Sequence, residues 1–434
     1  MTKSVAICTL GCKVNAYESE AMLEQFTRKG YTVVDFDCIS DVYIINTCTV
    51  THLGDRKSRQ MIRRAKQINP DAVLVVTGCY AQTAPEDVAA IPEVDIVLGS
   101  GDKGRVVEVV ETFLSTYKKV QQVSDIGEKL EFEELTVTGY ESKSRAFLKV
   151  QDGCNNFCSY CIIPYARGRI RSRSIENCVK EAKRLCENGF SEIVLVGIHL
   201  ASYGKECGGP YLIDLLSALH EIDGIKRIRM GSLEPTLFDE TFTERLASLP
   251  KICKHFHLSL QSGCDETLKR MNRKYTTADY ANAVENIRKR MPNAAITTDI
   301  MTGFPGETDE EFAKTMQFVE SIRFADAHIF KYSVRKGTRA EKMSGQVATH
   351  TKETRSQQLI ALTNASRQQF VTAHVGQTVQ VLFEQWHKGN SGIHEGKTDN
   401  YITVLVKSET DICGTFRSVT IVGEQNGYAL GEMI

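Results

Sequence analysis

Short apolar runs alternate with helix-like stretches along the first 120 residues of this 434-residue chain. The runs that predict β-strands are Val5–Leu10, Val42–Asn46, Ala72–Thr77 and Val94–Leu98. Because neighbouring parallel strands need a helical crossover between them, this alternation predicts a parallel α/β sheet with helices on both faces. Such a sheet brings the carboxyl ends of its strands to one edge, where open α/β sheets bind ligands.

A second strand–helix series begins near Arg145, after a polar stretch at 121–140 that we interpret as a linker. Six such units predict a partial (β/α)6 barrel, in which the chemistry lies at the carboxyl ends of the strands. From about residue 369, short β-rich runs at close spacing predict a small antiparallel β-barrel. The fold class is therefore α/β, with an N-terminal sheet domain at 1–120, a partial barrel domain at 141–368 and a small β-barrel domain at 369–434. The six strands predicted for the partial barrel are Ala146–Gln151, Glu192–Ile198, Arg227–Ser232, His255–Leu260, Ala295–Met301 and His328–Ser333.

The chain contains 14 cysteines, which is a high count for a cytosolic enzyme of this length. The N-terminus has no signal-peptide pattern and no apolar run is long enough to span a membrane, so we expect a cytoplasmic protein. Since disulfides are rare in that compartment, the cysteines indicate metal or redox chemistry. The formal net charge is −1, so any contact with nucleic acid must depend on local basic patches.

Three of the cysteines, Cys154, Cys158 and Cys161, form a C-x3-C-x2-C pattern directly after a predicted strand. Three thiolates in one loop can bind three irons of a four-iron cluster and leave the fourth iron open to a small molecule. A structural cluster would need a fourth cysteine close by, and the stretch 162–177 contains none. The alternatives are a structural zinc site and three unrelated packing cysteines, although zinc knuckles favour two separate C-x2-C pairs.

Three further cysteines, Cys12, Cys48 and Cys79, each follow a predicted strand of the N-terminal sheet. The carboxyl ends of parallel strands lie side by side, so we expect these thiols to converge although they are far apart in sequence. Three ligands again indicate a cluster with one open iron. The alternative is that the three cysteines pack as small apolar side chains.

The loop that begins at Cys154 resembles the cluster loop of the radical S-adenosylmethionine superfamily, and the whole chain resembles the methylthiotransferases within it. In that family the open iron binds the amino and carboxylate groups of S-adenosylmethionine, and an electron from the cluster cleaves this cofactor to a 5′-deoxyadenosyl radical. The radical removes hydrogen from an unreactive carbon, which then receives a methylthio group from the second cluster. The terminal barrel resembles the TRAM domain, a β-barrel that binds RNA. The resemblance implies one 4Fe-4S cluster on a radical triplet, Cys154, Cys158 and Cys161, and another on an auxiliary triplet, Cys12, Cys48 and Cys79.

The rim of the predicted barrel gathers polar residues and glycines at its strand ends, as a cofactor site requires. Glycines and small polar residues are also typical of ordinary turns, so at each position the alternative is a turn residue without a role in cofactor binding. The resemblance implies that this rim binds S-adenosylmethionine, and no catalytic residue beyond the cluster ligands is assigned. The cofactor-binding candidates are Gly197, Glu234, Gln261, Ser262, Arg273 and Asp299.

Two motifs, Cys8–Asn15 (CTLGCKVN) and Gly197–Gly204 (GIHLASYG), resemble the subgroup that modifies threonylcarbamoyladenosine. This resemblance implies C2 methylthiolation of N6-threonylcarbamoyladenosine at position 37 of tRNA, next to the anticodon. The alternatives are isopentenyladenosine in tRNA and an aspartate of a ribosomal protein. The implied partners are the tRNA anticodon stem-loop, a low-potential electron donor such as a flavodoxin or ferredoxin, and a sulfur donor, with no membrane.

Two groups of arginines are candidates for contact with RNA. One group lies on a predicted helix in which only Asp55 opposes the basic residues, and the other follows the radical triplet at alternate positions. Such residues can bind phosphates regardless of base sequence, whereas a solvated helix face is the alternative. The terminal barrel is a poorer candidate, because from Phe370 onward it has four Lys/Arg against seven Asp/Glu. The candidate residues are Arg56, Arg59, Arg63, Arg64, Arg167 and Arg169.

The stretch Gly99–Gly104 matches the G-x-G-x-x-G pattern of dinucleotide-binding folds. It follows the fourth predicted strand, whereas the dinucleotide fingerprint follows the first strand of its sheet. We therefore interpret it as a tight turn between a strand and a helix rather than as a nicotinamide site.

Overall fold

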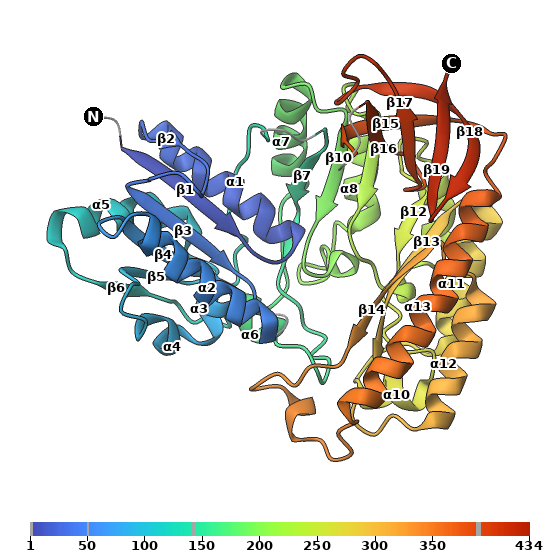
Figure 1. Ribbon diagram of the computed structural model, residues 1–434, viewed down its shortest axis with the longest axis horizontal. Helices are drawn as coiled ribbons and strands as arrows, with labels where there is room; N and C mark the ends of the chain where they lie inside the picture. Colours follow the sequence, from blue (N-terminus) through green and yellow to red (C-terminus); the bar gives the residue numbers. More distant parts are fainter. Residues whose placement is uncertain (1–2, 50–51, 141–143, 388–391) are drawn as a thin grey trace.

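The computed structural model describes residues 3–49, 52–140, 144–387 and 392–434. Figure 1 shows three parts: a sheet flanked by helices at the N-terminal end, a curved row of strands lined by helices, and a small barrel of strands near the C-terminus. Within these described residues, no helix is long and apolar enough to cross a membrane.

The N-terminal sheet is parallel throughout, with strand order β2-β1-β3-β4-β5-β6. Apolar residues of α1 and α5 cover one face, and those of α2, α3 and α4 cover the other. This two-sided cover explains why β3 and β4 are buried along their whole length, and it confirms the predicted sheet. The strands are β1 (Ser4–Thr9), β2 (Thr32–Val33), β3 (Val42–Thr47), β4 (Val73–Gly78), β5 (Ile96–Leu98) and β6 (Val120–Gln122). The helices are α1 (Lys13–Arg28), α2 (His52–Ile68), α3 (Cys79–Thr83), α4 (Pro85–Ala89), η1 (Lys103–Arg105) and α5 (Val106–Thr116).

The central domain has six parallel strands in the order β7-β10-β11-β12-β13-β14. Single bridges from Ile228 to Ile252 and from Leu233 to Leu258 join its two three-stranded halves, which confirms the partial (β/α)6 barrel. The six strands are β7 (Ala146–Lys149), β10 (Glu192–Val196), β11 (Arg227–Met230), β12 (His255–His257), β13 (Ala295–Thr302) and β14 (Asp326–Lys331). Its longer helices are α7 (Ile175–Glu187), α8 (Leu212–His220), α9 (Glu240–Ala247), α11 (Thr277–Arg290), α12 (Asp309–Ile322) and α13 (Thr349–Thr372). The short elements are β8 (Gln151–Asp152), β9 (Arg171–Ser172), α6 (Ile163–Arg167), α10 (Asp265–Arg270), η2 (Leu200–Ser202), η3 (Pro235–Leu237) and η4 (Arg339–Lys342).

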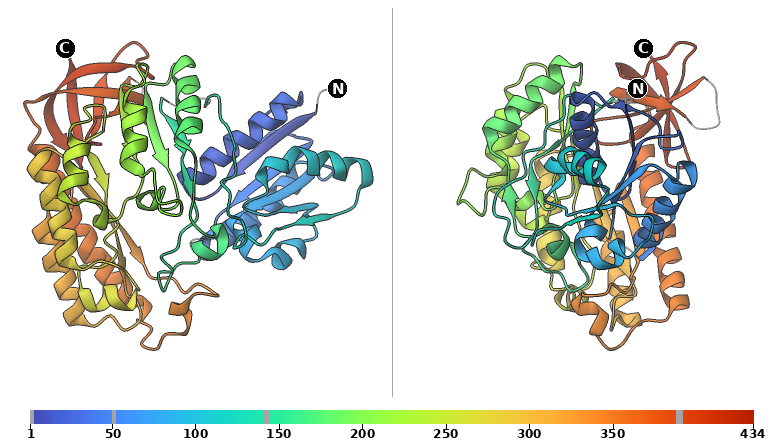
Figure 2. Two further views of the ribbon diagram at one scale, coloured as in Figure 1. Left: turned by 180° about the vertical axis from the view of Figure 1, so that it is seen from behind. Right: turned by 90° about the vertical axis from the view of Figure 1, so that its left-hand side faces the viewer.

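Helix α13 runs along the partial barrel to the small terminal barrel, as both views in Figure 2 show. The terminal barrel is closed, in the order β15-β16-β17-β19-β18. Its pairings are antiparallel except that β17 and β19 are parallel. The sequence predicted antiparallel strands only, and the parallel pair arises because β19 closes the ring against β17. The strands are β15 (Thr378–Trp386), β16 (Ile393–Lys397), β17 (Thr403–Lys407), β18 (Phe416–Gln425) and β19 (Tyr428–Met433).

Two buried arginines of β11 hold the terminal barrel against the partial barrel. Arg229 donates to the carbonyls of Thr398 (3.0 Å) and Asp399 (2.9 Å), and Arg227 donates to that of Lys397 (3.0 Å). These bonds engage the backbone carbonyls at the end of β16 and in the turn that follows it. The two barrels therefore have a fixed relative position.

Helix α1 contributes to two hydrophobic cores. Val14, Tyr17 and Ala21 pack into the core of the partial barrel, whereas Met22 and Phe26 pack into the core of the N-terminal sheet. The stretch at 121–140, interpreted as a linker, starts in β6 and continues to residues buried in the same partial-barrel core. The N-terminal sheet and the partial barrel thus share a helix and a packed connection.

Candidate active site and metal centres

The radical triplet lies in the loop between β8 and α6. The backbone shapes this loop, because the Cys154 N–H donates to the Gly168 carbonyl (3.1 Å) and the Cys161 N–H donates to that of Cys158 (2.9 Å). Gly153 has φ +74°, and a Cβ there would lie 1.8 Å from the Arg169 carbonyl oxygen. Only glycine fits this close approach, so the residue before the triplet is as constrained as the cysteines.

Burial raises the pKa of the Cys154 thiol to about 11 and that of Cys161 to about 12. Metal ligation requires thiolates, so binding of iron to this loop would release protons. Arg273 would compensate part of the resulting negative charge, because its Nη1 lies 3.3 Å from the sulfur of Cys158.

Glu234 is the centre of a polar group beside the radical loop. Its carboxylate accepts from Asn156 Nδ2 (2.8 Å) and lies 3.0 Å from His199 Nε2 and 3.3 Å from Arg273 Nη2. Burial alone would raise the pKa of Glu234, but the His199 hydrogen bond and the charge of Arg273 outweigh it and lower the pKa. The site therefore presents a charged carboxylate next to the loop that carries the cysteines.

The predicted cofactor residues Glu234 and Arg273 meet in this group, and two further residues of the group escaped sequence reasoning. Asn156 stands between the first two cysteines of the radical triplet, and His199 lies in the motif Gly197–Gly204. The signal that could have found both is their position, because Asn156 lies in the cysteine loop that begins at Cys154 and His199 lies in the motif Gly197–Gly204.

Gly197 serves the same region through its lack of a side chain. A Cβ there would lie 3.0 Å from Gln151 Oε1, which accepts the backbone N–H of His199 (2.7 Å). A larger residue would displace Gln151 and with it the backbone of His199. Gly197 therefore leaves room for Gln151, which fixes the backbone of His199. It follows β10, at a strand end as the sequence predicted.

The other three predicted cofactor residues lie apart from the Glu234 group. Gln261 has φ +66°, and its backbone N–H donates to the Asp299 carbonyl of β13 (2.8 Å). Asp299 itself pairs with His257 (3.2 Å). Ser262 is buried against the outer helix α12, with its hydroxyl 3.3 Å from that of Thr315. The same hydroxyl accepts the N–H of Cys264 (3.3 Å), the residue before α10, so the Ser262 side chain connects α10 and α12.

The auxiliary triplet lies at the carboxyl edge of the N-terminal sheet, after three neighbouring strands. Cys12 precedes α1, Cys48 follows β3 and Cys79 begins α3. A Cβ on Gly11 would lie 3.0 Å from the sulfur of Cys48, so the first two loops are in contact. Gly78 has φ +93° and a Cβ there would lie 2.5 Å from the Thr47 carbonyl oxygen, which brings the third loop equally close. The structure thus brings the three loops together, as the strand pattern predicted.

Asn15 fixes these loops from α1. Its Nδ2 donates to the carbonyls of Leu10 (2.7 Å) and Thr47 (2.9 Å), which flank the first two cysteines. On the other side, Arg167 of α6 donates from Nε to the sulfur of Cys79 (3.3 Å). Asn15 belongs to the CKVN motif, but its role could not be read from the sequence.

In neither triplet do all three sulfur atoms lie as close together as the ligands of a single tetrahedral metal ion. Four ligands of one tetrahedral zinc would lie about 3.8 Å apart, given Zn–S bonds of about 2.3 Å. Among the described residues, the group of three ligand atoms within 4.8 Å of one another is His394, Asp411 and Cys413 in the terminal barrel, and neither cysteine triplet forms such a group. In a four-iron cluster each cysteine binds a different iron, so wider spacing is required.

The basic residues of α2 form one hollowed surface of about 560 Å³. Asp55 is the one acidic residue in the sequence of α2, and its carboxylate forms an ion pair with Arg335 of the central domain (2.7 Å). Arg59 donates to the Tyr80 hydroxyl (2.9 Å) and Arg64 pairs with Asp37 (2.7 Å). The hollow is lined by Arg56, Arg59, Gln60, Arg63, Arg64 and Gln67.

The arginines that follow the radical triplet do not share one exposed face, which corrects the sequence interpretation. Arg167 is fully buried and binds Glu18, so it is not available to RNA. Arg171 and Arg173 are buried as well. Arg169 alone of these four is exposed, with its guanidinium 5.0 Å from the centre of the Phe157 ring. The physical reason is that three of the side chains turn inward to buried acids. Arg167 pairs with Glu18, Arg171 lies 3.8 Å from Asp152, and Arg173 pairs with Glu181 (2.9 Å).

Two family models cover the parts that carry the triplets. One, described as the radical SAM superfamily, matches residues 148–319, and the other, described as the uncharacterized protein family UPF0004, matches residues 4–99. A methylthiotransferase of Bacillus subtilis (strain 168) is 42% identical over 99% of this chain and 96% of its own length. The chain belongs to the radical S-adenosylmethionine methylthiotransferase family, transferases that use S-adenosylmethionine and two four-iron clusters.

That Bacillus relative is named threonylcarbamoyladenosine tRNA methylthiotransferase MtaB, as is one of Aquifex aeolicus (strain VF5), 40% identical over 92% of this chain and 96% of its own. A relative in Pelotomaculum thermopropionicum, named tRNA-2-methylthio-N(6)-dimethylallyladenosine synthase, is 37% identical over 99% of this chain and 97% of its own. Among solved structures, the radical S-adenosylmethionine methyltransferase TsrM of Kitasatospora setae covers 76% of this chain and 75% of its own, with a TM-score of 0.57 and 15% identity. That likeness supports the fold.

Proposed function

We propose that the protein adds a methylthio group to C2 of N6-threonylcarbamoyladenosine at position 37 of tRNA. The observation that carries the proposal is the match over almost the whole chain to relatives named for threonylcarbamoyladenosine in tRNA. These two relatives are 42% and 40% identical to the chain, whereas two relatives named for dimethylallyladenosine are 37% and 35% identical; a further relative named for threonylcarbamoyladenosine, from Thermotoga maritima, is 36% identical. The two converging sets of cysteines support a reaction that needs both a radical and a sulfur source.

In this proposal the radical triplet and the auxiliary triplet each hold a four-iron cluster with one open iron. When bound, the clusters and S-adenosylmethionine supply the radical and the sulfur. The chain's own residues supply placement. Arg273 holds Cys158 and Glu234 together, and Glu234 offers a charged acceptor for N–H or O–H groups of the cofactor. The proposal also includes a low-potential electron donor, such as a flavodoxin or ferredoxin, and a sulfur donor.

Mass spectrometry of tRNA nucleosides from a strain that lacks the gene tests the substrate. We expect the 2-methylthio derivative of threonylcarbamoyladenosine to disappear and to return when the gene is restored. The corresponding isopentenyladenosine derivative should be unchanged. If the threonylcarbamoyl derivative persists while the isopentenyl derivative disappears, the alternative substrate is correct.

Lys13 is our candidate for recognising the substrate, because the threonylcarbamoyl group carries a carboxylate and the isopentenyl group is apolar. Lys13 directly follows Cys12 and its side chain reaches solvent. The atoms packed around it, and the charges of Arg145 and Arg229, lower its pKa. Within the described residues its ammonium group has no hydrogen-bond or ion-pair partner, and the groups that favour its charge are the Tyr401 hydroxyl and the Cys12 thiol rather than a carboxylate. A cation next to a cluster ligand, without a carboxylate as its partner, is suited to bind an anionic group of the substrate.

Replacing Lys13 by glutamine should raise KM for tRNA that contains threonylcarbamoyladenosine by about 10- to 100-fold, since a charged hydrogen bond contributes about 1.5–3 kcal/mol. Cleavage of S-adenosylmethionine without tRNA should be unchanged. Lys29→Gln, at the exposed far end of the same helix, is the matched control. An unchanged KM in Lys13→Gln would show that another residue binds the carboxylate.

The hollow of α2 is our candidate for binding tRNA phosphates. Arg56 and Arg63 are exposed there. The double variant Arg56→Gln/Arg63→Gln should weaken tRNA binding and reduce the slope of log Kd against log salt by roughly 1.4–1.8, because each of the two phosphate contacts contributes about 0.7–0.9. Binding titrations at several salt concentrations measure this slope. Lys289→Gln/Arg290→Gln, on the exposed face of α11, should leave the slope unchanged, and equal slopes for both double variants would exclude α2 from the interface.

A further inference from the structure

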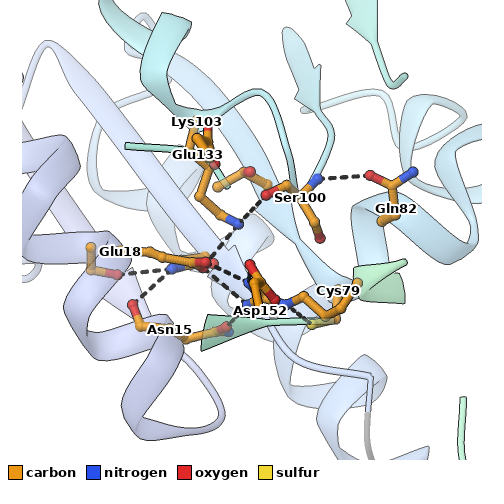
Figure 3. Close-up of polar contacts among 12 residues, drawn as sticks. Asn15, Glu18, Cys79, Gln82, Ser100, Lys103, Glu133 and Asp152 are labelled. Carbon is orange, nitrogen blue, oxygen red and sulfur yellow. Dashed lines mark hydrogen bonds and ion pairs between the residues drawn. The ribbon is translucent and has the colours of Figure 1, made fainter. Parts of the chain in front are cut away.

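A buried ionic cluster joins the N-terminal sheet to the partial barrel. Figure 3 shows Glu18, Lys103 and Asp152 around one set of contacts, with Asn15 and Cys79 at its margin. Glu18 of α1 is fully buried and pairs with Lys103 (2.9 Å) and Lys149 (2.7 Å), and Lys149 also pairs with Asp152 (2.6 Å). Lys103 belongs to the turn Gly99–Gly104, which matches the G-x-G-x-x-G pattern, so this turn places a lysine in the buried cluster.

Arg167 connects the cluster to the auxiliary triplet. One side of its guanidinium binds Glu18, with Nη2 3.0 Å from Oε2, and Nη2 also donates to Asn15 Oδ1 (2.5 Å). These bonds aim Nε at the sulfur of Cys79, 3.3 Å away. Helix α6, which ends at Arg167, packs on α3, which begins at Cys79. Since α6 starts two residues after Cys161, one rigid helix lies between the two triplets.

The charges of the buried cluster do not balance within it. It has four cations and three carboxylates, even when the half-buried Glu133 is counted as ionised. A buried charge is costly unless it is paired, and a metal-ligating cysteine carries a negative charge. Ligation by Cys79 would supply the missing charge next to Arg167. The cations are Lys103, Lys149, Arg167 and Arg171, and the carboxylates are Glu18, Glu133 and Asp152.

We propose that Arg167 is a positioning residue of the auxiliary site, which orients Cys79 and raises the reduction potential of the cluster bound there. The inference rests on the proposed assignment of that cluster to the auxiliary triplet. Hydrogen bonds to ligating sulfurs and nearby positive charge stabilise the reduced, more negative state of a cluster. Arg167 supplies both, from a site that water does not reach.

The test is a redox titration followed by electron paramagnetic resonance, in the full chain with Cys154, Cys158 and Cys161 replaced by alanine so that only the auxiliary cluster remains. We expect Arg167→Gln to shift the reduction equilibrium at least tenfold toward the oxidised cluster, which is 59 mV for a one-electron couple. Arg167→Lys keeps the charge but cannot hold the same fork of hydrogen bonds, so its shift should be smaller.

Arg167→Gln leaves three cations and three carboxylates, so the buried cluster of the variant is electrically balanced. Arg173→Gln is the matched control, since Arg173 is as buried and pairs with Glu181 (2.9 Å) away from the triplets. Loss of the auxiliary cluster in Arg167→Gln, but not in Arg173→Gln, would also support the positioning role. An unchanged potential in Arg167→Gln, or an equal shift in Arg173→Gln, would overturn it. If the chain with all cysteines intact binds one cluster only, the auxiliary assignment fails, and this inference with it.

Discussion

Replacing Cys154 by alanine should abolish reductive cleavage of S-adenosylmethionine. The radical loop offers three cysteines, and with two ligands left it cannot hold a four-iron cluster with an open iron. Chromatographic detection of 5′-deoxyadenosine after reduction with dithionite measures the activity. The iron content should fall from about eight to about four per chain, if each triplet holds four irons.

The matched control for this variant is Cys207→Ala. Cys207 belongs to the same domain, is exposed and lies in neither triplet. It should cleave S-adenosylmethionine at the rate of the unmodified protein. If Cys154→Ala retains cleavage, the radical loop does not hold the reactive cluster and the proposed mechanism is wrong.

The second large effect is expected from Cys48→Ala, which should retain cleavage of S-adenosylmethionine and lose methylthiolation. Cys48 is the middle of the three sheet-edge loops and touches the loop of Cys12, so its removal leaves two ligands for the auxiliary cluster. The radical loop lies on another domain and keeps all its ligands. Assays of 5′-deoxyadenosine and of modified nucleoside on the same sample separate the two activities.

Cys38→Ala is the control for the sheet domain, because Cys38 is exposed and follows no strand of the auxiliary edge. It should support both activities. Methylthiolation by Cys48→Ala at the control rate would refute the auxiliary assignment, whereas loss of cleavage as well would show that the two sites depend on one another.

The two α/β parts of the fold were predictable because their signals are local. The apolar runs and their helical crossovers fix which strands are parallel, and therefore that Cys12, Cys48 and Cys79 follow strands at one edge. The parallel pair of β17 and β19 was not predictable, since it depends on how a ring of five strands closes. No pattern within β19 distinguishes its two partners.

The site was predictable where the chemistry follows from residue type, and not where it follows from distant partners. Cysteine spacing indicates iron, but an arginine looks the same in sequence whether it binds RNA or a buried carboxylate. Arg167 binds Glu18, 149 residues away, and no local pattern connects them. Glu234 likewise meets Asn156 and His199 through three separate loops.

Helix α1 packs one end into the partial-barrel core and the other into the core of the sheet domain. Separating the two domains would expose apolar surface on both sides and leave Glu18 without Lys149 and Arg167. Opening of one domain therefore carries the energetic cost of opening the other, which makes the pair a single cooperative unit. The sheet domain, which carries the auxiliary triplet, therefore cannot unfold locally while the partial barrel, which carries the radical triplet, keeps its structure.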